Sequence, residues 1–212
     1  MNKTRRDVVL KGFTIVELLI VIVVIGILAA ITVVAYNGIQ SRAYGAKAAA
    51  TANIYAKALS IYKNTNGYYP DVPPTPPAKD GAEQFRSCLG EASMYPASGE
   101  FAAGECDYVK WTGYPDWGVV TDPTVMAAIK TTLSPIPNTI WPSTDSYWTD
   151  GASDVQKDGI RGLVYTSYPT NSTTPSTATI VYGVPGTEVC PSGIKTDSSS
   201  TDNDTYCKIN LN

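Results

Sequence analysis

The sequence predicts an α+β protein in which one long N-terminal helix packs against a small antiparallel sheet. Three observations lead to this class. An almost uninterrupted apolar run extends from residue 13 to 35, a helical apolar stripe follows it, and short β-rich segments lie beyond a proline-rich stretch. The apolar run is long enough to cross a bilayer, for which about 20 residues suffice.

The apolar run contains a single carboxylate, Glu17. A charged side chain costs roughly 2.5–3.5 kcal/mol at the centre of a membrane helix and less near its end. An ordinary anchor or signal peptide gives no reason for this cost, so we expect Glu17 to have a partner. If the chain is cut after Gly12, Phe13 acquires a free α-amino cation that a neighbouring copy can present to Glu17. The sequence therefore indicates self-assembly.

The segment Lys11–Glu17 (KGFTIVE) and the apolar residues after it resemble the class III signal of type IV pilins and type II secretion pseudopilins. In that family, a prepilin peptidase cuts between the glycine and the phenylalanine and methylates the new amine. The resemblance implies cleavage between Gly12 and Phe13, methylation of Phe13, assembly through Glu17 and Phe13, and a pilin-like fold. Val34 stands where many pilins have a proline, so a helix break there is not implied.

Other interpretations of the apolar run explain it less well. A signal-peptidase substrate has a shorter apolar core and an A-x-A site before the cut. A plain single-pass anchor leaves Glu17 unexplained, and a buried core helix is not expected to be apolar on every face.

Charge is distributed unevenly along the chain. The formal net charge is −3, although residues 1–12 carry four cations and one acid, as the positive-inside rule requires of a cytoplasmic leader. Residues 36–70 carry a net charge of +4, and residues 71–212 carry −9. The basic and acidic parts can attract each other between copies, although a solvated surface is the simpler interpretation. The acidic C-terminal part argues against a nucleic-acid partner, because phosphate binding needs Lys and Arg.

The helix is predicted to continue beyond residue 35 as an amphipathic segment that packs on a globular head. Its apolar stripe comprises Ile39, Ala43, Ala46, Ala50, Ile54, Ala58 and Ile61. Turn-forming residues from 64 to 70 end the helix. The predicted organisation is a leader (1–12), a transmembrane or filament-core helix (13–35), its amphipathic continuation (36–66), a proline-rich linker (67–80) and an α+β head (81–212).

The head contains recognisable helix and strand signals. Asp122 and Pro123 predict an N-capped helix that ends near residue 133, and residues 82–89 fit a short helix. The strand candidates are residues 107–111, 117–121, 162–168 and 177–184, of which the last two form an antiparallel pair.

The four cysteines are predicted to form two disulfides. They cluster locally as Cys88 with Cys106 and Cys190 with Cys207, although four cysteines allow three connectivities. A zinc site is the alternative, and without histidine it needs four thiolates. Pilin-like proteins often close a C-terminal loop with a disulfide, so the resemblance assigns that role to Cys190 and Cys207.

Three further features have two interpretations each. Asp197, Asp202 and Asp204 fit either a polar surface loop, which we favour, or a hard-cation site. Asn171 and Asn203 begin glycosylation sequons, which also arise by chance. The aromatic residues Tyr108, Trp111, Tyr114 and Trp117 fit a packed core better than a glycan-binding surface.

No catalytic arrangement is evident, because the chain has no histidine to activate a nucleophile and no phosphate-binding glycine motif. We expect no enzyme activity, no cofactor and no metal site. The resemblance implies a structural subunit of a type IV pilus or similar filament. The alternative is a pseudopilin or minor tip subunit of a secretion or DNA-uptake machine. The partners that the resemblance implies for this chain are other copies of the chain, a prepilin peptidase, an assembly platform and membrane lipid. The implied location is the membrane before processing and a surface filament afterwards.

Overall fold

The structure is a computed structural model of the chain. It describes residues 13–71, 86–111, 116–139, 144–149, 155–168, 177–184, 190–195 and 205–211. The chain divides into two compact units, Met1–Gln40 and Ser41–Asn212, and helix α1 (Ile15–Asn66) contributes to both. The predicted leader and residues 72–80 of the predicted linker lie outside the described residues.

In the first unit, α1 exposes apolar side chains on every face. Phe13 is 86% exposed, and the large apolar residues from Ile15 to Ile39 whose side chains are described are all exposed. By length and composition, this helix is apolar enough to cross a membrane. The described part of this unit therefore has no buried core of its own.

The second unit contains two antiparallel sheets. The five-stranded sheet has the order β1 (Arg86–Leu89), β6 (Leu163–Tyr168), β7 (Thr177–Val184), β9 (Thr205–Leu211) and β8 (Ile194–Lys195). The four-stranded sheet has the order β3 (Trp117–Val120), β2 (Glu105–Trp111), β5 (Val155–Ile160) and β4 (Thr144–Thr149). Outside the sheets lie a 3-10 turn (Ala92–Met94) and helix α2 (Pro123–Lys130).

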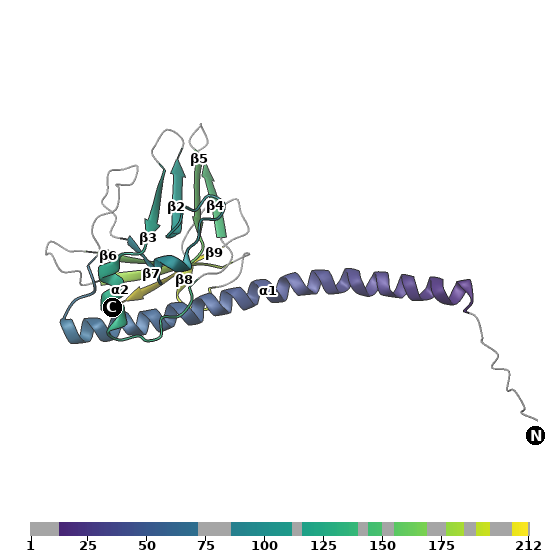
Figure 1. The fold of residues 1–212 in the computed structure, drawn as a ribbon, viewed down its shortest axis with the longest axis horizontal. Coiled ribbons are helices and arrows are strands. Elements are labelled where there is room, and N and C mark those ends of the chain that lie inside the picture. Colours follow the sequence, from purple (N-terminus) through teal and green to yellow (C-terminus); the bar gives the residue numbers. More distant parts are fainter. Residues whose placement is uncertain are drawn as a thin grey trace, which may run out of the picture. The chain divides into compact units, whose positions relative to one another are not determined.

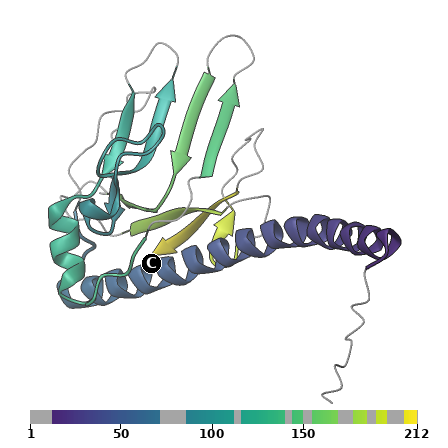
Figure 2. The same cartoon turned by 45° about the vertical axis from the view of Figure 1, so that its right-hand side comes forward.

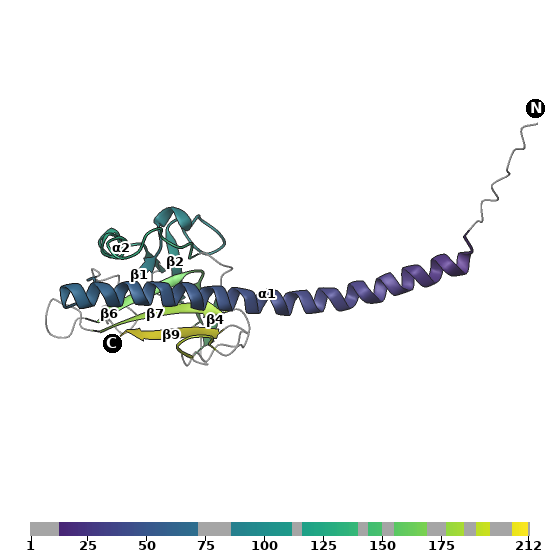
Figure 3. The ribbon, with the colours of Figure 1, turned by 90° about the horizontal axis from the view of Figure 1, so that it is seen from below.

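Within this unit, α1 from Ser41 onward packs against one side of the five-stranded sheet. Strands β6, β7 and β9 lie along α1 (Figures 1 and 3), and the four-stranded sheet rises from the other side of the five-stranded sheet (Figure 2). One apolar core lies between α1 and the five-stranded sheet and includes Tyr55, Tyr165 and Ile180. A second core lies between the sheets and includes Val119 and Val164. The predicted α+β class, with a long helix against antiparallel strands, is confirmed.

The face of α1 that packs on the sheet is not the predicted one. Ile54 and Ile61 remain 44% and 43% exposed, and of the predicted stripe only Ala58 is buried. The buried stripe instead comprises Gly45, Ala48, Ala49, Thr51, Ala52, Tyr55, Ala58 and Leu59. Its small residues allow the helix axis to approach the sheet closely, and its two large side chains fill the core. The pattern was wrong because it treated every Ala and Ile alike and left out the aromatic Tyr55.

Helix α2 begins as predicted. Asp122 Oδ1 accepts the backbone N–H groups of Thr124 at 2.7 Å and Val125 at 3.0 Å, and Pro123 occupies the first helical turn. The helix ends at Lys130, slightly before the expected residue 133. The helix expected at residues 82–89 is wrong where it is described, because Arg86–Leu89 forms strand β1 and pairs with β6.

The predicted strands correspond to β2, β3, β6 and β7, and the antiparallel pairing of the last two is confirmed, with Leu163 opposite Tyr182. Strands β1, β4, β5, β8 and β9 were not predicted. Several of them are short or carry polar residues, as in the β5 sequence VQKDGI. Their pairing depends on the partner strand more than on local propensity.

Gly45 provides a test of the helix–sheet contact. A Cβ atom at Gly45 would lie 2.8 Å from Val184 Cγ1, whereas a Cβ atom at Gly38 in the same helix would have no neighbour within 4 Å. Gly45→Val is therefore expected to lower the free energy of unfolding of the head by about 1–3 kcal/mol through overpacking. The measurement is chemical denaturation of the detergent-solubilised chain, followed by tryptophan fluorescence.

Gly38→Val is the matched control and is expected to leave head stability unchanged. Val184→Ala in the Gly45→Val background should recover part of the loss, because it removes the contacting methyl groups. Equal stability of the two glycine variants would show that α1 does not approach β7 at this position.

Candidate functional site

The first turn of α1 contains a reciprocal set of hydrogen bonds between Thr14 and Glu17. The Thr14 backbone N–H donates to Glu17 Oε2 at 2.9 Å, and the Thr14 hydroxyl donates to the same oxygen at 2.7 Å. In return, the backbone N–H of Glu17 donates to Thr14 Oγ1 at 3.2 Å. This arrangement is a capping box, in which two side chains satisfy backbone donors that the helix cannot pair internally.

The sequence interpretation did not include Thr14. It placed Glu17 opposite the α-amine of Phe13 in another copy, but within one chain the carboxylate is already bonded to Thr14. The pattern Thr-x-x-Glu at the start of an apolar run was the signal that identifies this contact. Phe13 itself is exposed next to the capping box, and Gly12 lies outside the described residues.

The surroundings of Glu17 are apolar. Between Phe13 and Ser41 the sequence has no other charged residue, and the neighbouring Leu18 and Ile20 are exposed on the helix surface. When such a surface is covered by hydrocarbon or by other helices, the effective dielectric around the carboxylate falls and its attraction to a cation increases. The site is therefore chemically suited to bind one positive group on an apolar partner.

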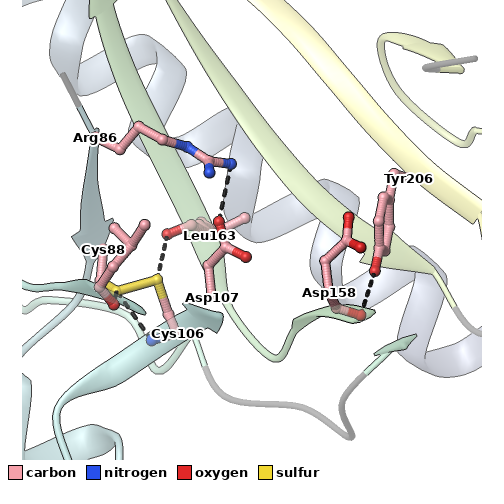
Figure 4. A network of polar contacts seen from close by, with 8 residues as sticks. Arg86, Cys88, Cys106, Asp107, Asp158, Leu163 and Tyr206 are labelled. Atoms are coloured by element: carbon pink, nitrogen blue, oxygen red, sulfur yellow. Dashed lines mark hydrogen bonds and ion pairs between the residues drawn. A yellow bond between two sulfur atoms is a disulfide. The ribbon is translucent and has the colours of Figure 1, made fainter. Parts of the chain in front are cut away.

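Two disulfides cross-link the second unit. Cys88 in β1 is bonded to Cys106 in β2, so this bridge joins the five-stranded sheet to the four-stranded sheet (Figure 4). Cys190 is bonded to Cys207 in β9, which closes the loop that contains β8. The structure thus contains the two local pairs expected from the sequence, and both residues of the first pair are fully buried.

A buried ion pair lies beside the first disulfide. Arg86 Nη2 lies 2.8 Å from Asp107 Oδ2, an ion pair without hydrogen-bond geometry, and Asp107 is only 2% exposed. Figure 4 shows Asp158 next to Asp107, with the Tyr206 hydroxyl donating to the Asp158 main-chain oxygen at 3.4 Å. Burial raises the pKa of Asp107 to about 6, an effect that Arg86 only partly offsets. The pair connects β1 with β2, so it links the same two sheets as the disulfide.

Of the predicted aromatic residues, the structure describes the side chain of Tyr108. It is buried and packs edge-on against Phe101, with ring centroids 4.7 Å apart, as expected of a core residue. Among the described residues, no group of three or more His, Cys, Asp or Glu side chains is placed to hold a metal.

Several predicted features fall outside the described residues. These are Tyr114, the side chains of Trp111 and Trp117, the acidic loop with Asp197, Asp202 and Asp204, and the sequons at Asn171 and Asn203.

Comparison with known proteins finds a motif match that covers Thr14 and Glu17. A family model described as the prokaryotic N-terminal methylation motif matches residues 11–33. A fimbrial protein of Moraxella nonliquefaciens is 34% identical over 94 residues, which are 44% of this chain and 60% of that relative. The chain thus spans less than two thirds of the curated relative that it matches. No solved structure matches the chain.

The buried Asp107 predicts a pH dependence of head stability. Its pKa in the folded chain is raised to about 6, whereas an unfolded aspartate titrates near 4. Between about pH 4 and pH 6 the folded state therefore binds more protons, so the free energy of unfolding falls as the pH rises, by up to about 3 kcal/mol. Asp107→Asn removes this contribution.

The measurement is equilibrium denaturation of the detergent-solubilised chain across that pH range. The difference between Asp107→Asn and the native chain should change in favour of the variant as the pH rises. Asp116→Asn, which alters an exposed carboxylate, should follow the native curve. Parallel curves for Asp107→Asn and the native chain would contradict the raised pKa.

Proposed function

We propose that this chain, a type IV pilin-like protein with an N-terminal methylation motif, is a structural subunit of a type IV pilus or a closely related filament. In this proposal the chain is cut between Gly12 and Phe13, the new amine is methylated, and subunits assemble through the apolar part of α1. The observation that carries the proposal is the single carboxylate, Glu17, on a helix that is otherwise apolar and exposed on every face from residue 13 to 33.

The exposed apolar helix needs a covering. Soluble monomers rarely expose a contiguous apolar surface of this extent. Lipid supplies the covering while the subunit resides in the membrane, and other copies supply it in a filament. Gly26, Ala29 and Ala30 favour close approach of neighbouring helices, because small residues let helix backbones pack closely. Apart from the adjacent helix backbone, a Cβ atom at Gly26 would meet nothing within 4 Å, so its surface is open to another chain.

Glu17 supplies the register between copies. An attraction between its carboxylate and a neighbouring α-amine is on the order of 4 kcal/mol at about 4 Å and an effective dielectric of 20, before desolvation is subtracted. A buried charge without its partner costs several kcal/mol. The pair therefore penalises subunits that dock in the wrong register more than it adds to overall affinity.

The remaining parts of the chain have matching roles in this proposal. Residues 1–12 form a basic cytoplasmic leader that a prepilin peptidase removes, and the rest of the chain passes to a pilus assembly platform. The head lies outside the cytoplasm, where its two disulfides are stable. The intact Glu17 favours a main-body subunit over a tip subunit. Abundance of the chain in sheared surface filaments would separate a pilus subunit from a pseudopilin.

Substitution of Glu17 tests this proposal. Glu17→Val removes the charge from the apolar surface, so membrane insertion should be unchanged or easier, while the filament yield falls by about tenfold or more. Glu17→Asp should give an intermediate yield, because the charge remains but its reach is shorter. The measurement is the amount of the variant in membranes and in sheared filaments, with the native chain absent.

Thr32→Val is the matched control, since it replaces the other hydroxyl-bearing residue of the same apolar run. The Thr32 hydroxyl donates within the helix to the Ala29 carbonyl oxygen at 2.9 Å, so its loss should leave the filament yield unchanged. A native filament yield from Glu17→Val would remove the carboxylate as an assembly determinant.

A further inference from the structure

The capping box gives Thr14 a role that the methylation motif does not assign to it. We infer that Thr14 is a positioning residue for assembly: it holds Glu17 Oε2 within its own chain and leaves Oε1 to receive the α-amine of Phe13 from a neighbouring copy. This inference rests on the proposed function, because it concerns how the same carboxylate is presented to its partner.

The hydrogen bonds from Thr14 use only one of the two oxygens of the Glu17 carboxylate. Both donors of Thr14, the backbone N–H and the hydroxyl, bond to Oε2, at 2.9 and 2.7 Å. An ionised carboxylate has acceptor sites on both oxygens, so Oε1 keeps its capacity to accept a further donor. The carboxylate therefore binds its own helix and a second chain through different oxygens, and neither contact displaces the other.

The Thr14 hydroxyl is held in one orientation. It donates to Glu17 Oε2 and accepts the backbone N–H of Glu17 at 3.2 Å, so it acts as donor and acceptor within one helical turn. A free glutamate side chain loses rotamer freedom when it enters an interface. Because Thr14 has already fixed the side chain, less of this freedom is lost when the neighbouring amine binds, which is the advantage of preorganisation.

The same contact makes Glu17 tolerable in the bilayer. A buried polar group is costly when it has no hydrogen bond, and two local donors reduce that cost while the subunit has no neighbour. The Thr14 nitrogen is an amide both before and after a cut at Gly12, so the contact does not depend on processing. The charge on the Phe13 nitrogen, in contrast, appears only after the cut. Thr14 thus keeps the carboxylate ready through insertion and processing until a neighbour arrives.

The test is co-assembly of the full chain with the native chain in cells that process and assemble it. Mass-tagged variants are quantified in sheared filaments relative to the processed pool in the membrane. Thr14→Val has nearly the same volume without the hydroxyl, and its incorporation should fall by about fivefold or more. Thr14→Ser keeps the hydroxyl and should stay within about twofold of native, whereas a role in packing the threonine methyl group would not be rescued by serine.

A double variant shows whether Thr14 acts through Glu17. If it does, adding Thr14→Val to Glu17→Val should cause no further loss, because residues that share one interaction are not additive. Native incorporation of Thr14→Val, failure of Thr14→Ser to restore incorporation, or a full additional loss in the double variant would each overturn the inference. Retention of residues 1–12 by Thr14→Val alone would do so too, by placing the hydroxyl in peptidase recognition. Native incorporation of Glu17→Val would instead overturn the proposed function.

Discussion

A carboxylate surrounded by hydrocarbon must have a hydrogen-bonding or charged partner, and the organisation of this chain follows from that requirement at Glu17. In one chain, Thr14 meets it with two donors to a single oxygen. In the proposed assembly, the amine of Phe13 from another copy meets it through charge. Once lipid or other helices cover the exposed apolar surface, the lower effective dielectric strengthens that attraction. In this proposal, filament register, leader removal and the N-terminal position of the carboxylate are parts of one arrangement.

The two parts of α1 solve different packing problems. From residue 13 to 33 the helix is apolar all round, which suits lipid and other helices. Beyond Ser41 it presents Gly45 and several alanines to the five-stranded sheet, and Tyr55 fills the core. The Cys88–Cys106 disulfide cross-links the two sheets of the head, and the Arg86–Asp107 ion pair lies across the same boundary.

Local chemistry with a fixed spacing was predictable from the sequence. The segment KGFTIVE and the apolar run predicted the N-terminal methylation motif that the family model matches, and Asp122 before a proline located helix α2. Features that depend on tertiary partners were not predictable. The packed stripe of α1 depends on which alanines lie against β7, and strand β5 forms from a polar sequence because β2 and β4 pair with it. The Thr14–Glu17 contact also has a local signal, because Thr-x-x-Glu before an apolar run is the spacing of a capping box.

A distance measured across the subunit boundary tests the proposed pairing of Glu17 with the amine of a different subunit. Filaments grown from a mixture of two populations, one with ¹⁵N at the Phe13 amine and the other with ¹³C at glutamate carboxyl groups, report only contacts between chains in solid-state dipolar dephasing. If the pair forms between subunits, the methylated amine should dephase as expected for a separation within about 4 Å. Dephasing in doubly labelled chains but not in the mixture would place the pair within one chain and rule out the pairing between subunits.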